Sequence, residues 1–151
     1  MKFSLFVHME RINPQQSHKE LYREMVDLSE MADRGGFHAI WTGEHHGMDF
    51  TIAPTPLINI AAPARRTKNV RLGTGTVVAP FWHPIKLAGE AAMTDIISDG
   101  RLDLGIARGA YNFEYQRMGK NIEPMSAGEQ MREMVPALRK LWEGDYTHEG
   151  K

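Results

Sequence analysis

The sequence contains no cysteine. This absence excludes disulfide bonds, thiolate nucleophiles and thiolate metal sites, so catalysis would have to use histidines, carboxylates, hydroxyls or a cofactor. The sequence also lacks any apolar run of the roughly 20 residues that span a bilayer, and its apolar start, residues 3–7, is too short for a secretory signal. We therefore expect a cytoplasmic protein.

Neither sign of charge is in excess, since 18 Lys and Arg side chains oppose 19 Asp and Glu side chains. Such a chain has no broad electrostatic field to attract nucleic acid or an anionic membrane, so we expect a small-molecule partner. Its residues are 42% hydrophobic and 25% charged, which is typical of a soluble globular protein with a hydrophobic core.

Short apolar segments that resemble β-strands recur about every 30 residues, with helical patterns between them. The predicted strands are residues 2–8, 37–42, 69–75 and 101–107. This alternation is typical of parallel sheets with right-handed crossovers. Four such units are about half of a (β/α)8 barrel, which needs about 250 residues. We therefore predict residues 1–151 to be a single domain, the amino-terminal half of a TIM-type barrel.

Helix signals lie between the predicted strands. Ser17 and Glu20 have the spacing of a capping box, and the pairs Thr55-Pro56 and His83-Pro84 begin the next two helices. A last helix is expected from near Ser126 to Trp142, with a kink or break near Val135 because Pro136 removes a hydrogen bond.

Two further structural interpretations follow from this pattern. A flavodoxin-like sandwich is the alternative fold, although its phosphate-binding loop is missing after the first strand, where MERINPQQS has no glycine. A half barrel would also expose unpaired strand edges, which favours a homo-oligomer such as a dimer.

Polar residues cluster directly after the second predicted strand, where parallel βα folds place their active sites. Glu44, His45 and His46 combine a carboxylate with groups that titrate near neutrality, which suits acid or base catalysis. A solvated polar loop is the structural alternative. A metal site with His83 is a third interpretation, weakened because adjacent residues of an extended segment point in opposite directions.

The third and fourth predicted strands are followed by GTGTVVAP and by GIARGAYNFEY. Glycines in the first segment either admit a flat ligand or relieve a tight bend of the sheet, and the G-x-G-x-x-G nucleotide pattern is incomplete. Arg108 in the second segment could hold a phosphate through its planar guanidinium. Alternatively, Arg108 only pairs with Glu114 at the surface.

Four motifs occur in one order, namely KFSLFVHM, GFHAIWTGEHH, LGTGTVVAPFWHP and DGRLDLGIARGAYNFEY. In this order the chain resembles the amino-terminal part of the bacterial luciferase-like flavin monooxygenases. The resemblance implies a (β/α)8 barrel that uses reduced FMN, supplied by a separate flavin reductase, and dioxygen to oxidise a small organic substrate.

The resemblance also implies roles for individual residues. His45 would be the catalytic base or hydrogen-bonding partner, with Glu44 orienting it. Gly75 and Thr76 match the position of a non-prolyl cis peptide beside the flavin ring. Arg108 would lie near the flavin phosphate, and Glu90 near the ring.

Other features limit what the resemblance implies. Ala107 stands where light-emitting members have a reactive cysteine, so we do not expect bioluminescence. The family binds much of the phosphate through later strands, so flavin binding by this chain alone should be weak or absent. Two alternatives remain: a non-catalytic half-barrel association module, and an enzyme that transfers hydride with the deazaflavin F420. The identity of the substrate is not predicted.

Overall fold

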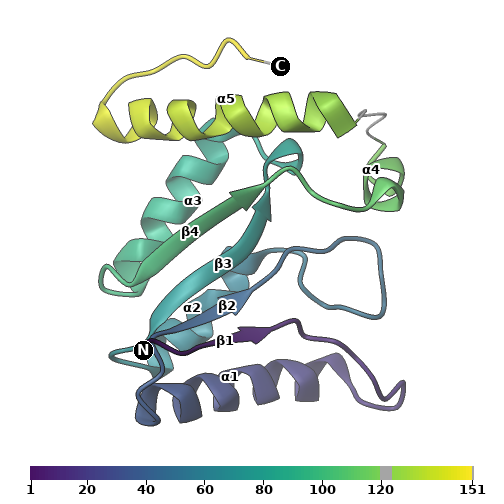
Figure 1. Cartoon of the computed structure of the whole chain (residues 1–151), viewed down its shortest axis with the longest axis vertical. Coiled ribbons are helices and arrows are strands. Elements are labelled where there is room, and N and C mark those ends of the chain that lie inside the picture. Colours follow the sequence, from purple (N-terminus) through teal and green to yellow (C-terminus); the bar gives the residue numbers. More distant parts are fainter. Residues whose placement is uncertain (120–123, 151) are drawn as a thin grey trace.

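The computed structural model describes residues 1–119 and 124–150 and contains one parallel sheet (Figure 1). Its strands β1 (Ser4–Val7), β2 (Ala39–Thr42), β3 (Arg71–Val78) and β4 (Leu102–Ala107) lie in the order β1-β2-β3-β4. All three pairings are parallel, and the spatial order of the strands equals their order in the sequence, as in a (β/α)8 barrel. The predicted half barrel is confirmed.

The helices α1 (His18–Arg34), α2 (Pro56–Arg66) and α3 (Pro84–Ile97) follow β1, β2 and β3 and lie on one side of the sheet (Figure 1). A short 3₁₀ turn, η1 (Ala79–Phe81), continues β3. After β4 come α4 (Asn112–Arg117) and the long α5 (Pro124–Glu143), which packs against α3. Among the described residues, no helix is long and apolar enough to cross a membrane.

The predicted capping box of α1 is present. The hydroxyl of Ser17 accepts a hydrogen bond from the Glu20 backbone N–H, and the Glu20 carboxylate accepts one from the Ser17 backbone N–H. Both bonds satisfy amide groups that the first helical turn leaves without partners. At α2, Pro56 is the first helical residue as predicted, but the Thr55 side chain makes no capping hydrogen bond.

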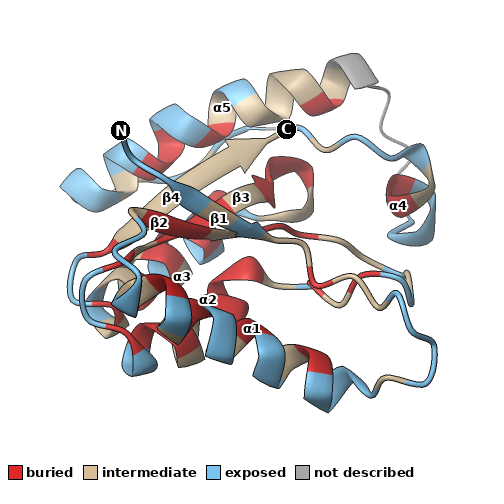
Figure 2. Ribbon diagram, turned by 60° about the horizontal axis from the view of Figure 1, so that its bottom comes forward, coloured by how far each residue is buried: buried red, intermediate tan, exposed pale blue. Residues whose placement is uncertain are grey.

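The hydrophobic core lies between the sheet and the helix layer (Figure 2). One cluster joins α2 to the first three strands, a second joins β3, α3 and α5, and a third, smaller one packs α1 against Met9. The most deeply buried large side chains include Ile60, Leu72, Leu87 and Leu138. Because these residues come from different βα units, burying them fixes each helix on its strands.

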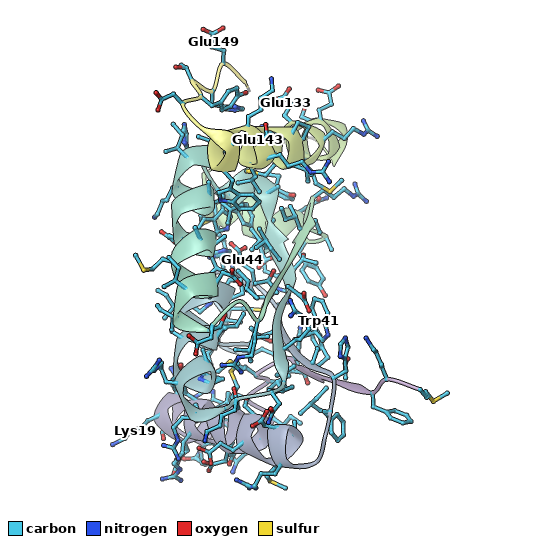
Figure 3. The ribbon with its side chains drawn as sticks, turned by 90° about the vertical axis from the view of Figure 1, so that its left-hand side faces the viewer. Lys19, Trp41, Glu44, Glu133, Glu143 and Glu149 are labelled. Atoms are coloured by element: carbon cyan, nitrogen blue, oxygen red, sulfur yellow. The ribbon has the colours of Figure 1, made fainter. Side chains whose placement is uncertain are left out.

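The opposite face of the sheet carries no helix in the described part of the chain. Trp41 extends from this face, whereas Glu44 lies between the sheet and the helices (Figure 3). A β-carbon at Gly73 would overlap the Trp41 indole, so glycine is required there. Phe6, on the neighbouring strand, is 51% exposed. In a closed barrel this face would be the packed interior.

The last helix was expected to start near Ser126 and to kink or break near Val135, and the break is absent. Helix α5 continues past Pro136 without a break and begins at Pro124, so Ser126 lies inside it. A proline removes one hydrogen bond, but Met134, Ala137 and Leu138 on either side of it are buried, and this packing outweighs the local cost of about 3 kcal/mol. Helix α4 was not predicted from the sequence.

Candidate active site

The carboxyl ends of β2, β3 and β4 meet at one rim and enclose a cavity of about 340 Å³. This cavity brings together the three sequence segments that were expected to share a site. It is lined by Glu44, His45, Gly75, Thr76, Val78, Ala107, Arg108, Gly109, Ala110, Tyr111 and Glu114. The shared rim follows from parallel strands, whose ends lie on the same edge of a sheet.

Glu44 is the structural centre of the rim, with a side chain that is 1% exposed. Its carboxylate accepts hydrogen bonds from the Val78 backbone N–H at 2.7 Å and from the Trp82 indole N–H at 2.9 Å. The His46 Nε2 atom lies 2.6 Å from its other oxygen. Glu44 therefore ties the end of β2 to the segment that follows β3.

His45 has different partners, so the expectation that Glu44 orients it was wrong. Its Nδ1 atom lies 3.3 Å from a carboxylate oxygen of Glu114, and its Nε2 atom lies 3.1 Å from Nε2 of His8. The same Glu114 oxygen accepts the His46 backbone N–H at 2.7 Å. The reason is alternation along an extended segment, which puts Glu44 and His46 on one side and His45 on the other.

The peptide bond between Gly75 and Thr76 is cis, as the sequence resemblance implied. Both residues line the cavity, together with the small residues Ala107 and Gly109. A β-carbon at Gly75 would come within 2.9 Å of the Phe6 ring. Because Gly75 has no β-carbon, the backbone of the rim is accessible to a flat ligand.

Arg108 is exposed and lines the same cavity, but the predicted alternative, a surface pair with Glu114, is not found in the described part of the chain. Glu114 is instead 3% exposed and directed at His45 and His46. The backbone carbonyl of Arg108 accepts the Tyr115 hydroxyl. Burial raises the pKa of Tyr115, which keeps this hydroxyl protonated and able to donate.

Glu90 lies apart from the other predicted cofactor residues. It is on α3 and lines a neighbouring cavity of about 240 Å³ with Glu44, His46 and Trp82. Its carboxylate is 3.6 Å from the ammonium of Lys86, one helical turn away. His83 caps α3 by accepting the Ile85 backbone N–H. Within residues 1–119 and 124–150, no three His, Asp or Glu side chains are grouped to hold a metal ion.

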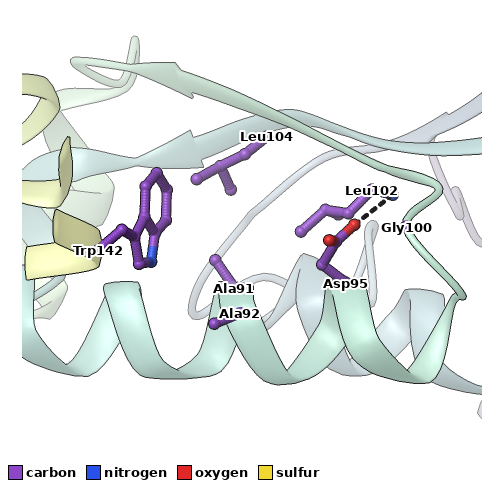
Figure 4. Close-up of a pocket in the computed structure, with 7 residues that line it drawn as sticks. All are labelled: Ala91, Ala92, Asp95, Gly100, Leu102, Leu104 and Trp142. Carbon is purple, nitrogen blue, oxygen red and sulfur yellow. Dashed lines mark hydrogen bonds between the residues drawn. The ribbon is translucent and has the colours of Figure 1, made fainter.

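A larger cavity of about 480 Å³ lies between α3, β4 and α5 (Figure 4). Its lining is mostly apolar, including Ala91, Leu104 and Trp142, and the Asp95 carboxylate there accepts the Leu102 backbone N–H at 3.1 Å. This cavity offers no titratable pair for catalysis. It borders β4, the strand that would receive a fifth strand in a complete barrel.

Three further residues of the site were not predicted from the sequence. His8 directly follows β1 and was assigned to the strand itself, although the rule applied to the other strand ends would have selected it. Glu114 was treated as a surface residue because α4 was not recognised. Trp82 gave no signal, since an indole in a short turn is usually core.

The residues that line the rim cavity suit a flavin. Gly75, Ala107 and Gly109 leave room for a planar ring, and the exposed guanidinium of Arg108 is a cation suited to an anion at the cavity mouth. His45 lines the same cavity, with its ring centroid 5.7 Å from that of Tyr111.

The parallel sheet and the polar rim at its carboxyl end are the arrangement found in part of an α/β barrel. A family model described as luciferase-like monooxygenase matches residues 1–151. The chain belongs to this family.

Individual relatives agree with this assignment. The chain is 70% identical over 151 residues to the oxygenase component of a flavin-dependent trigonelline monooxygenase from Acinetobacter baylyi, and spans 42% of that protein. A monooxygenase structure from Streptomyces bottropensis matches all of this chain with a TM-score of 0.91 at 37% identity, and 46% of that structure is covered.

A third similar protein has flavin bound. The oxygenating constituent of 3,6-diketocamphane monooxygenase from Pseudomonas putida, solved with FMN, matches the whole chain with a TM-score of 0.90 at 29% identity. The chain covers 42% of that structure. The chain therefore spans less than half the length of each of these three relatives.

Proposed function

We propose that the protein is the oxygenase component of a flavin-dependent monooxygenase that uses reduced FMN and dioxygen to oxidise a small organic substrate. Residues 1–151 would be one folding unit that contributes the amino-terminal half of the site. The observation that supports this proposal most is the single cavity shared by His45, Gly75 and Arg108. Membership of the monooxygenase family supports the same reaction class.

The bound flavin would supply the oxidising chemistry, and residues of this chain would position the flavin and the substrate and transfer protons. Gly75, Thr76 and Ala107 would face the flavin ring, while Arg108 would hold an anionic group of the cofactor. His45 would take or give a proton in the cavity, and the buried Glu114 would fix the orientation of its ring. Glu114 would therefore have the orienting role that was expected of Glu44. Glu44 would instead stabilise the rim as a structural residue.

Trigonelline is the first substrate to test, because the relative named for that substrate is 70% identical to this chain. The same name contains the words oxygenase component, which supports a separate reductase as the source of reduced flavin. We propose that pairing for this protein as well.

The test is oxygen consumption by the complete gene product, supplied with reduced FMN, reduced F420 or neither, and with trigonelline present or absent. We expect substrate-dependent oxygen uptake and an oxygenated product only with reduced FMN. The variant His45→Gln should lose at least about 100-fold in turnover, and the matched variant His18→Gln, which changes an exposed histidine on α1, should not. Hydride transfer from F420 without oxygen uptake would overturn the assignment, and failure to bind either cofactor would favour the association module.

A further inference from the structure

Four side chains form a line of hydrogen bonds from the cavity towards solvent. The Glu10 carboxylate lies 2.7 Å from His8 Nδ1, His8 Nε2 lies 3.1 Å from His45 Nε2, and His45 Nδ1 lies 3.3 Å from Glu114. Exposure of the side chains rises along the line, from 3% at Glu114 and 15% at His45 to 32% at His8 and 38% at Glu10. The line therefore connects a buried carboxylate to the surface.

The three hydrogen bonds of this line determine how many protons it must hold. Each of its three hydrogen bonds needs one proton, two neutral imidazoles supply two, and ionised carboxylates supply none. The complete line thus holds one extra proton between Glu10 and Glu114. Two arrangements satisfy every bond: His45 doubly protonated with His8 neutral, or the reverse. They differ only in which Nε2 atom carries the central hydrogen.

The backbone fixes His8 and Glu10 in place. Met9 between them is 3% exposed and has a left-handed conformation with φ of 55°. Glu10 forms an antiparallel bridge with Thr51, and the Arg11 backbone N–H donates to the Phe50 carbonyl at 2.7 Å. A non-glycine residue adopts this conformation only where its surroundings enforce it. The side chains of His8 and Glu10 are therefore carried by an ordered backbone that holds them near His45.

We propose that His8, held by Glu10, is a positioning residue that relays protons between His45 and solvent. When His45 gives up its Nε2 proton, that N–H bond breaks and an N–H bond forms at His8 Nε2. The His8 Nδ1 proton then moves to the Glu10 carboxylate, which releases it to water. No other reactant is needed. The relay rests on the proposed function, because it serves the proton transfer assigned to His45.

Other charged or titratable groups also surround the pair. They lie near His45, so a variant must change the line without changing them; they are Glu44, His46, Arg108 and Tyr111. The substitutions His8→Gln and Glu10→Gln meet this condition. Glutamine keeps hydrogen-bonding atoms at each position but does not titrate between pH 5 and 8.

The experiment is a pH titration of the complete gene product, labelled with ¹⁵N-histidine and followed by NMR. In the wild type, the ¹⁵N signals of His8 and His45 should change together with pH, because the two Nε2 atoms share one proton. In His8→Gln, the pH dependence of the His45 signals should differ from that in the wild type, because the glutamine that replaces its partner does not titrate in this range. His18→Gln, which alters a histidine that pairs with Asp49, is the matched control and should leave both curves unchanged.

Kinetics provide a second readout. The pH profile of turnover should shift in His8→Gln and in Glu10→Gln, and a small imidazole buffer should restore part of a turnover loss of about 10-fold in the first variant. Identical His45 titration curves in wild type and both variants would overturn the relay. The NMR experiment does not need flavin. Coupled titration of His8 and His45 without oxygenase activity would therefore refute the proposed function but would still support a proton shared by the two histidines.

Discussion

Replacing the buried carboxylate of Glu44 should destabilise the protein far more than replacing an exposed glutamate. In Glu44→Ala, the Val78 backbone N–H and the Trp82 indole N–H both lose their acceptor in a site that is 1% exposed. Each unsatisfied buried donor costs about 1 to 3 kcal/mol. We therefore expect the free energy of unfolding to fall by about 3 to 4 kcal/mol.

The variant Glu44→Gln separates hydrogen bonding from charge. Its amide oxygen can still accept from Val78 and Trp82, and its amide nitrogen can donate to His46. Only the extra strength of bonds to a charged acceptor is lost, and the cost of burying a charge is removed, so we expect a loss below about 2 kcal/mol. The order of stability should therefore be wild type, then Gln, then Ala.

Urea unfolding at pH 7, followed by far-UV circular dichroism, measures these differences. Glu24→Ala, at an exposed position on α1, is the matched control and should change the stability by less than about 0.5 kcal/mol. If Glu44→Ala unfolded at the same urea concentration as Glu24→Ala, the carboxylate would not be the tie between β2 and the segment after β3.

Two further predictions concern the polar groups that hold the opposite end of the sheet. Arg101 is 8% exposed and donates hydrogen bonds to the carbonyls of residues 64, 70 and 98 and to the Thr67 hydroxyl. Because an ammonium cannot reproduce this planar set of donors, Arg101→Lys should lower the free energy of unfolding, measured in urea, by about 3 kcal/mol. An unchanged urea midpoint would contradict this prediction. Burial alone would raise the pKa of Asp33, but backbone N–H donors of residues 68–70 outweigh it and hold that pKa below its ordinary value. The ionised form therefore stabilises the fold above about pH 4, and this contribution is lost as the pH falls through the folded pKa. Asp33→Asn should be less stable than wild type by about 2 kcal/mol at pH 7, with the gap narrowing in acid, and urea midpoints across pH would refute this if the gap stayed constant.

Much of the fold was predictable because its signals are local. The capping box at Ser17 and the proline at position 56 are read within one turn of helix, and alternation of strands and helices then leaves few topologies. The course of α5 was not predictable in the same way. Whether Pro136 breaks a helix depends on how much its neighbours bury against α3 and β3, which are far away in the sequence.

The candidate site was predictable as a place but not as a set of contacts. Parallel topology alone brings His45, Gly75 and Arg108 to one rim. Which carboxylate faces His45 depends on alternation along residues 44–46 and on the placement of α4, which brings in Glu114 from 69 residues away. The role of His8 depends likewise on a contact across 37 residues that no local pattern indicates.

Binding of flavin at the rim cavity can be tested with one substitution at each of two alanines. Ala107 and Ala92 are both partly buried and each lines a cavity, but only Ala107 lies at the rim. Titration of the complete gene product with FMN, followed by visible absorbance, should show binding weakened at least about 10-fold in Ala107→Leu and unchanged in Ala92→Leu, because the added side chain occupies the space of the ring. Equal FMN affinity in wild type and Ala107→Leu, or a loss confined to Ala92→Leu, would contradict the account.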